Sequence, residues 1–293
     1  MISTEMTASC QPHATLTFRR AQSFSAVCIS EPFRSTALFL TLVALLVTPA
    51  CHGNSPEIVN NGEITVAAAA DLGPAFEELG REFHNTSKIK VTFSFGSTGL
   101  LAKQIENGAP MDVFAAANTD YIDQLDREGL VISGTSTIYA RGRITLWTPK
   151  SSSLQIEKIS DLTRPEVKRV AIANPDHAPY GMAAREALEH AGVWESVKPR
   201  LVYGENIRQT LQYAETGNVE VAIVALSLSM QSDGRWVLIP EELHKPLDQA
   251  LAVIKGTKNE KAAREFAEFV NGSQGRAVMR KYGFAPPVET PSK

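Results

Sequence analysis

The sequence predicts an α/β protein built of two lobes, each a mostly parallel sheet flanked by helices, with a hinge between the lobes. Short apolar runs typical of buried parallel strands alternate with stretches whose apolar residues recur at helical spacing. This alternation occurs in two successive cycles. The chain has 293 residues, 43% of them hydrophobic, which is enough for two cores. One large, doubly wound sheet is the alternative architecture.

The first cycle begins with an apolar strand predicted over 64–70, after which the period changes to that of a helix from Leu72 onward. Pro74 lies in the first turn of that helix, where its missing N–H costs nothing. Two further strands and a helix are predicted over 90–95, 112–116 and 100–107. Alternating strands and helices imply a parallel sheet that binds ligands at the carboxyl ends of its strands.

The second cycle contains the same kinds of element. Strands are predicted over 143–147, 170–173, 201–203, 219–226 and 250–254. Helices are predicted over 181–190, 207–215 and 260–271. We expect the chain to leave the first lobe near Ala140 and to return near Leu247, and a cleft between lobes is a usual place for a small ligand. The predicted domains are a first lobe of 62–140 and 248–287, a second lobe of 141–247, and a tail of 288–293.

Residues 1–51 predict a leader for export. Arg34 precedes an apolar run over 37–47, and small residues follow it up to Cys51, an order typical of a secretory signal. These 11 residues are too few to cross a bilayer as a helix, so a membrane anchor is the weaker hypothesis. The 3 cysteines all lie within the leader, so the predicted mature chain forms no disulfide. Cleavage after Ala50 and lipid attachment to Cys51 both remain open, and residues 52–61 are predicted as a tether.

Four segments place small hydroxyl or backbone N–H donors where a predicted helix begins. They are residues 68–71, 96–99, 178–181 and 204–207. A helix N-terminus carries unpaired N–H groups and about half a positive charge, so it can hold an anion without lysine or arginine. Aimed at one point, the four segments would form a neutral cage for a small oxyanion. This pattern predicts a binding protein.

Composition and motifs argue against other classes of protein. The net charge of −3 includes no basic surplus, so nothing indicates a nucleic-acid partner. The sequence contains no phosphate loop with lysine, no nucleophile elbow and no zinc-protease pair. His177 has no second histidine or cysteine at ligand spacing, so we predict no metal-ion ligand and no catalytic residue, and we interpret His177 as a loop histidine with a structural hydrogen bond. A hydrolase that uses Asp71 and His177 is the enzyme alternative.

Five motifs occur in order along the mature chain. They cover residues 66–72, 95–102, 104–110, 173–181 and 280–284. In sequence and spacing they resemble the periplasmic molybdate-binding proteins of ABC-type oxyanion importers. The resemblance implies a type II periplasmic binding protein fold, whose two lobes close on tetrahedral molybdate or tungstate. It also implies a periplasmic location, permease and ATPase subunits in the inner membrane as partners, a monomer, and no cofactor.

The resemblance also implies which residues bind the oxyanion. They are Ala70, Asp71, Ser97, Thr98, Tyr180 and Ile207. Ser97 and Thr98 would supply hydroxyls, and Ile207 a backbone N–H. The family's tyrosine from the late strand falls at Ala225, which has no hydroxyl, so that role is assigned to Tyr180 together with its backbone N–H.

Asp71 is the exception in this set, because its carboxylate would repel a dianion in a dry cleft. In one interpretation the carboxylate caps its own helix, and the backbone N–H of Asp71 faces the anion. In the other, the carboxylate accepts a proton from a protonated oxyanion such as hydrogen phosphate or arsenate.

The predicted function is an extracytoplasmic receptor for molybdate or tungstate, and a receptor for phosphate, sulfate or chromate on the same fold is the alternative.

Overall fold

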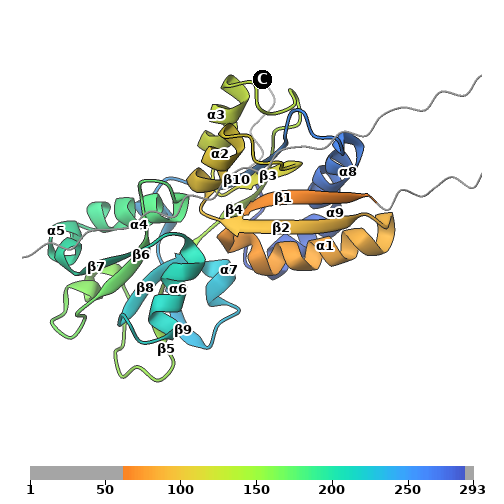
Figure 1. Ribbon diagram of the computed structural model, residues 1–293. Coiled ribbons are helices and arrows are strands. Elements are labelled where there is room, and N and C mark those ends of the chain that lie inside the picture. Colours follow the sequence, from red (N-terminus) through yellow and green to blue (C-terminus); the bar gives the residue numbers. More distant parts are fainter. Residues whose placement is uncertain (1–61, 288–293) are drawn as a thin grey trace, which may run out of the picture. The chain divides into compact units, whose positions relative to one another are not determined.

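The computed structural model describes residues 62–287 (Figure 1). The predicted leader (1–51), tether (52–61) and tail (288–293) lie outside the described residues. The described strands form two separate five-stranded sheets. This arrangement confirms the prediction of two lobes and excludes one large, doubly wound sheet.

The first sheet joins early strands of the chain with one late strand. Its strands are β1 (Glu63–Ala69), β2 (Lys90–Gly96), β3 (Val113–Ala116), β4 (Thr137–Gly142) and β10 (Leu247–Val253). They lie in the order β2-β1-β3-β10-β4. β1 pairs in parallel with β2 and β3, whereas β10 is antiparallel to both β3 and β4. Only β10 therefore runs against the other strands of this sheet, which is mostly parallel as predicted.

The second sheet repeats this plan. Its strands are β5 (Ile144–Pro149), β6 (Val170–Ala173), β7 (Leu201–Gly204), β8 (Val221–Ala225) and β9 (Gly234–Leu238). Their order is β7-β6-β8-β5-β9, with β6 parallel to β7 and β8. β5 is antiparallel to β8 and β9, so it alone runs against the other four. The strands that point the same way end at one edge, and the helices that follow them begin there.

Helices cover both faces of the first sheet (Figure 1). They are α1 (Gly73–Ser87), α2 (Thr98–Glu106), α3 (Thr119–Arg127), α8 (Glu260–Asn271) and α9 (Ser273–Lys281). α1 and α8 pack their aromatic side chains against each other on one face, where the rings of Phe83 and Phe266 lie 5.3 Å apart. On the other face, Leu101 and Ile105 of α2 join Ile122 and Leu125 of α3 in a second apolar cluster. Burial of both faces explains why β1 and β3 are almost wholly apolar.

The second lobe has helices of its own. They are α4 (Pro179–His190), α5 (Trp194–Val197), α6 (Ile207–Glu215) and α7 (Leu226–Ser229). Four short 3₁₀ helices are η1 (Ala70–Leu72), which leads into α1, and η2 (Ile159–Thr163), η3 (Lys198–Arg200) and η4 (Glu241–Leu243). No helix among residues 62–287 has both the length and the apolar character needed to cross a membrane.

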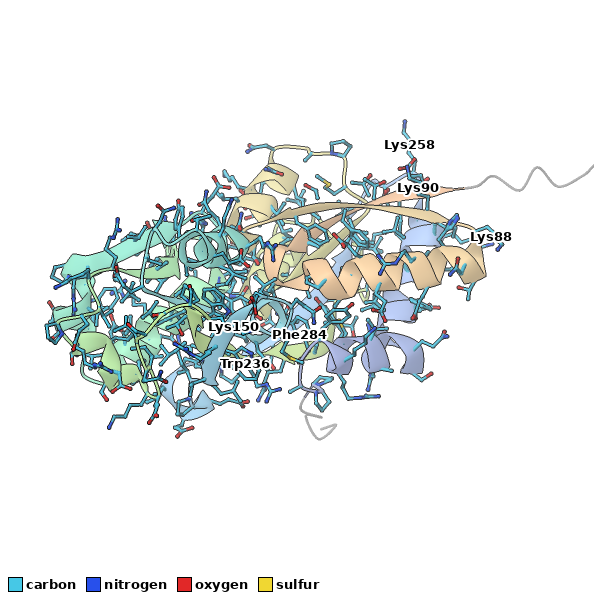
Figure 2. All side chains as sticks on the ribbon, turned by 90° about the horizontal axis from the view of Figure 1, so that it is seen from below. Lys88, Lys90, Lys150, Trp236, Lys258 and Phe284 are labelled. Carbon is cyan, nitrogen blue, oxygen red and sulfur yellow. The ribbon has the colours of Figure 1, made fainter. Side chains whose placement is uncertain are left out.

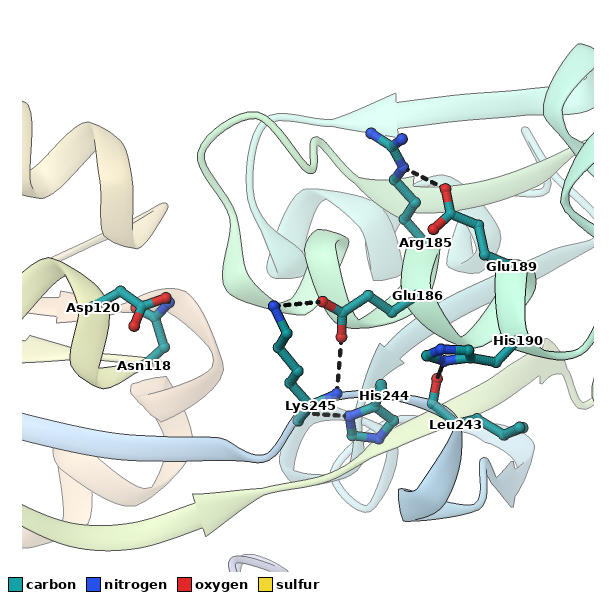
Figure 3. Close-up of polar contacts among 9 residues, drawn as sticks. All are labelled: Asn118, Asp120, Arg185, Glu186, Glu189, His190, Leu243, His244 and Lys245. Atoms are coloured by element: carbon teal, nitrogen blue, oxygen red, sulfur yellow. Dashed lines mark hydrogen bonds and ion pairs between the residues drawn. The ribbon is translucent and has the colours of Figure 1, made fainter.

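The chain passes between the sheets twice. It leaves the first sheet at Arg143, between β4 and β5, and it returns between β9 and β10. The returning segment is attached to α4 (Figure 3). The backbone N–H of Lys245 donates to the Glu186 carboxylate at 2.8 Å, and the carbonyl oxygen of Leu243 lies 2.7 Å from Nδ1 of His190. These bonds hold α4, whose first turn forms part of the site described below, beside the return to the first lobe.

Gly181 sits where α4 begins against the end of β6. A Cβ atom there would overlap the carbonyl oxygen of Ala173 and lie 2.9 Å from the backbone nitrogen of Pro175. Because backbone atoms cannot rotate away, we expect Gly181→Ala to lower the free energy of unfolding by about 1–3 kcal/mol, measured by urea denaturation. Gly73→Ala is the matched control, since nothing lies within 4 Å of a Cβ at that helical position. Equal unfolding midpoints for the two variants would contradict this packing.

Candidate functional site

A small cavity lies where strands of both sheets end and helices begin. All six residues predicted to bind an oxyanion line it: Ala70, Asp71, Ser97, Thr98, Tyr180 and Ile207. About 190 Å³ of space, part of it open to solvent, lies between these residues, so the cavity is much smaller than a drug-sized pocket. The first four residues belong to the first lobe and the last two to the second, so the folded chain brings together positions up to 137 residues apart.

Backbone N–H groups at three helix starts are free to bind a ligand. The N–H groups of Thr98 in α2, Tyr180 in α4 and Ile207 in α6 have no acceptor within the described part of the chain. In α6 the side chain of Asn206 accepts hydrogen bonds from the backbone N–H groups of Arg208 and Gln209, and the N–H of Ile207 is left unbonded. Three positively polarised helix ends therefore meet at the cavity, at three of the four segments predicted from the sequence, and the fourth segment leads into the short helix η1.

The Thr98 hydroxyl is prepared to donate. Its oxygen accepts the backbone N–H of Ala117 at 3.2 Å, and Thr98 is almost fully buried. A hydroxyl has one hydrogen to donate, and the bond from Ala117 leaves that hydrogen unused. This geometry fits the predicted role of Thr98 as a hydroxyl ligand.

The Ser97 hydroxyl is engaged by the second lobe. Its oxygen donates to the carbonyl oxygen of His177 at 2.8 Å and lies 2.8 Å from the ring Nδ1 of the same residue. The backbone N–H of Gly99 also donates to the His177 carbonyl, at 2.9 Å. These bonds confirm the structural role predicted for His177. They also leave Ser97 lining the cavity with its hydroxyl bonded across the lobes.

Asp71 is fully buried, and its carboxylate does not cap a helix. Oδ2 accepts hydrogen bonds from the Tyr180 hydroxyl at 2.9 Å and from Nε2 of Gln249 at 2.6 Å. Oδ1 has no partner, and no side chain caps η1 or α1. The capping interpretation of Asp71 is therefore wrong: the carboxylate points to the other lobe and the late strand instead of to its own helix.

Burial controls the ionisation of the Asp71 carboxyl group. It raises the pKa of Asp71 from 3.8 to about 6, against the opposing effect of the hydrogen bonds from Tyr180 and Gln249. The pKa values of the Tyr180 and Tyr139 hydroxyls lie well above their ordinary value, because both are buried and the Asp71 charge disfavours phenolate. Both phenols are therefore neutral donors at physiological pH, and Asp71 is the group in the cavity that changes charge near neutrality.

Four residues that surround Asp71 were not predicted from the sequence as part of the site. Gln249 is a fully buried polar residue in β10, and the Tyr139 hydroxyl lies 3.5 Å from its Oε1. Ser227 of the second lobe donates to the backbone carbonyl of Asp71 at 2.8 Å. A Cβ at Gly142 would overlap the Tyr180 hydroxyl. A glutamine at the start of the apolar run 250–254 was the one available signal, since a polar residue in a buried strand needs a partner.

No lysine, arginine or histidine is among the residues that line the cavity. Figure 2 shows Lys88, Lys90 and Lys258 at the outer end of the first lobe. Lys90 begins the 7-residue strand β2 and the cavity lies past its other end, so roughly 20 Å separate them. Charges at that distance are screened at physiological salt. Residues 62–287 also contain no cluster of three side chains able to hold a metal ion.

The positions of Asp71 and His177 do not support the hydrolase alternative. His177 is bonded to Ser97, whereas Asp71 is bonded to Tyr180 and Gln249. Within the described residues no hydrogen bond joins Asp71 to His177, so the proposed acid–base pair is not assembled. The cavity can hold a small anion by donated hydrogen bonds.

Comparisons with known proteins place the chain among binding proteins. Residues 64–285 match the family described as bacterial extracellular solute-binding protein. The molybdate-binding protein ModA of Rhodobacter capsulatus is 32% identical over 256 residues, which cover 87% of this chain and 97% of the relative. The putative ABC transporter substrate-binding lipoprotein YvgL of Bacillus subtilis is 32% identical over 260 residues, covering 86% and 98%.

A solved structure shows the same architecture. The periplasmic molybdate-binding protein of Azotobacter vinelandii matches with a TM-score of 0.73 at 27% identity, over 76% of this chain and 99% of that protein. This similarity confirms the predicted two-lobed periplasmic binding protein fold.

The buried charge of Asp71 gives a prediction about stability. The folded state binds the Asp71 proton more tightly than the unfolded state does. The protonated carboxyl group therefore stabilises the fold relative to the charged one; this stabilisation is complete below pH 3.8 and is lost as the pH rises through about 6. We therefore expect Asp71→Asn to raise the free energy of unfolding at pH 8 by up to about 3 kcal/mol, and by much less at pH 4.

Urea denaturation at both pH values measures this difference. Asp233→Asn is the matched control, because the Asp233 side chain is 84% exposed and its removal should have the same small effect at either pH. An Asp71→Asn variant that is equally destabilised at both pH values would show that burial does not penalise the charge.

Proposed function

Because the chain belongs to the bacterial extracellular solute-binding proteins, we propose that it is a receptor that captures molybdate or tungstate and delivers it to an ABC importer. Relatives from several bacteria, each covered over most of its length, are named molybdate-binding proteins. The protein acts by binding and release, without a catalytic step and without a cofactor.

One observation carries this proposal: helix starts from both lobes meet at one cavity that no cationic side chain lines. The proposed ligand groups are the hydroxyl of Thr98 and the backbone N–H groups of Thr98, Tyr180 and Ile207, with Ala70, Asp71 and Ser97 forming part of the wall. Hydrogen bonds to an ionised acceptor are strong, and they strengthen when the site excludes water. Neutral donors thus hold a doubly charged guest.

The shape of the site supports selection by size. A rigid set of N–H donors can contact an oxyanion well only if its oxygens reach all of them at once. Molybdate and tungstate are larger than sulfate, so the same cavity would leave some donors unpaired around sulfate. Unpaired buried donors are costly, and this cost is the proposed basis of discrimination.

The proposed partners are the permease and ATPase subunits of an importer in the inner membrane, in line with the name of the Bacillus subtilis relative, a putative ABC transporter substrate-binding lipoprotein. We further propose that the protein works outside the cytoplasm as a monomer, exported by the leader over 1–51. Cys51, the predicted candidate for lipid attachment, lies outside the described residues.

A ligand panel tests the proposal directly. Molybdate, tungstate, sulfate, phosphate and chromate are each added to the purified protein, and the melting temperature is measured. We expect molybdate and tungstate to stabilise it, by about 2.7 kcal/mol at a free concentration 100 times the Kd. Stabilisation by phosphate or sulfate with none by molybdate would replace this proposal by the alternative oxyanion receptor.

Replacement of Thr98 tests the ligand set. Thr98→Ala removes one charge-assisted hydrogen bond, so we expect molybdate to bind about 10- to 100-fold more weakly in calorimetry. Thr86→Ala is the matched control, since the Thr86 hydroxyl bonds only to carbonyls of its own helix α1, far along the chain from the cavity. An unchanged affinity in Thr98→Ala would remove this hydroxyl from the site.

A further inference from the structure

One atom in the cavity is not explained by a cage of donors. Oδ1 of Asp71 is buried and has no hydrogen-bond partner, although the residue lines the cavity and its other oxygen accepts two bonds. A buried, unpaired carboxylate oxygen is costly. It would also repel an anion held beside it. Both problems are removed by a hydrogen on Oδ1.

We propose that Asp71 contacts the bound oxyanion through one proton shared between its Oδ1 and an oxygen of the anion, so that a fully ionised anion is bound together with one proton from solvent. The inference rests on the proposed function and adds a chemical requirement to it. A hydrogen oxyanion, such as hydrogen phosphate, would bring this proton itself. In either case the complex contains the anion, the Asp71 carboxyl group and one proton.

The hydrogen bonds around Asp71 determine which oxygen carries the proton. Nε2 of Gln249 can only donate, and it lies 2.6 Å from Oδ2 and 3.1 Å from the Tyr180 hydroxyl. The Tyr180 hydroxyl accepts that second bond and donates its own hydrogen to Oδ2 at 2.9 Å. Oδ2 is therefore an acceptor twice over, which leaves Oδ1 as the oxygen able to carry a proton.

The surroundings supply no positive charge that could take the place of the proton. Tyr139 from β4, Tyr180 from α4 and the neutral Gln249 from β10 face the carboxyl group, and Ser227 from α7 bonds its backbone carbonyl. Of the nearby ionisable residues, His177 is bonded to Ser97, while Arg208 of α6 and Glu77 of α1 line the adjacent groove. A proton is the simplest positive charge that can reach Oδ1.

The raised pKa of Asp71 makes such a proton accessible. At about 6 it lies close to neutrality, so the free protein takes up the proton readily in mildly acidic solution and less readily as the pH rises. Linkage then requires the observed Kd for a fully ionised anion to rise about tenfold per pH unit once the pH is above this pKa. A cage of permanent donors would show no such slope.

Calorimetry with sodium molybdate tests the inference on the unmodified protein. Titrations between pH 6 and pH 9 are expected to show the tenfold rise per unit. Titrations at pH 8 in two buffers with different ionisation enthalpies should show uptake of about one proton per bound molybdate. A constant Kd with no proton uptake overturns the inference but leaves the receptor function intact, whereas absence of molybdate binding at every pH refutes the receptor function itself.

Two variants identify the titrating group. In Asp71→Asn, the amide oxygen can accept from Tyr180 and Gln249 while the amide nitrogen provides a permanent donor, so we expect tight binding whose Kd no longer depends on pH. His177→Asn is the control for the imidazole that is bonded to Ser97 beside the cavity, and it should keep the slope. Loss of the slope in His177→Asn, or its persistence in Asp71→Asn, would overturn the assignment to Asp71.

Discussion

The direction of the strands is the constraint on which the rest of the structure depends. Each sheet has three adjacent parallel strands, and each of these strands passes its chain to a helix at the same edge. Helix N-termini are consequently concentrated at one end of each lobe, where their N–H groups lack partners. The chain builds a positive potential from peptide groups alone, which allows an anion site in a protein of net charge −3.

The same edge also concentrates the contacts between the lobes. Ser97 and Gly99 bond to the His177 carbonyl, and Asp71 bonds to Tyr180 through its side chain and to Ser227 through its backbone. Three of the residues that line the cavity, Asp71, Ser97 and Tyr180, therefore also join the lobes. A buried carboxylate in this position reduces the stability of the fold, which is typical of residues kept for binding.

The sequence predicted those parts of the molecule that local periodicity encodes. The long apolar strands and the helices that follow them were found, because burial on both faces of a sheet leaves a continuous apolar run. α3, β4, α5, α7, β9 and α9 were not predicted, since each is short and contains few apolar residues. The six predicted residues, which all line the cavity, followed from helix starts and the resemblance. Their hydrogen bonds did not, because Gln249 is 178 residues from Asp71 and no local pattern reports such a pair.

Gly142 links the segment that connects the two lobes to the geometry of the site. It ends β4, directly before the chain enters the second lobe, and a Cβ there would overlap the Tyr180 hydroxyl and lie 3.1 Å from Nε2 of Gln249. The phenol at 180 can reach Asp71 only because position 142 has no side chain. A side chain at position 142 would therefore force the Tyr180 hydroxyl away from Asp71 and Gln249, so the course of the chain between the lobes constrains the site.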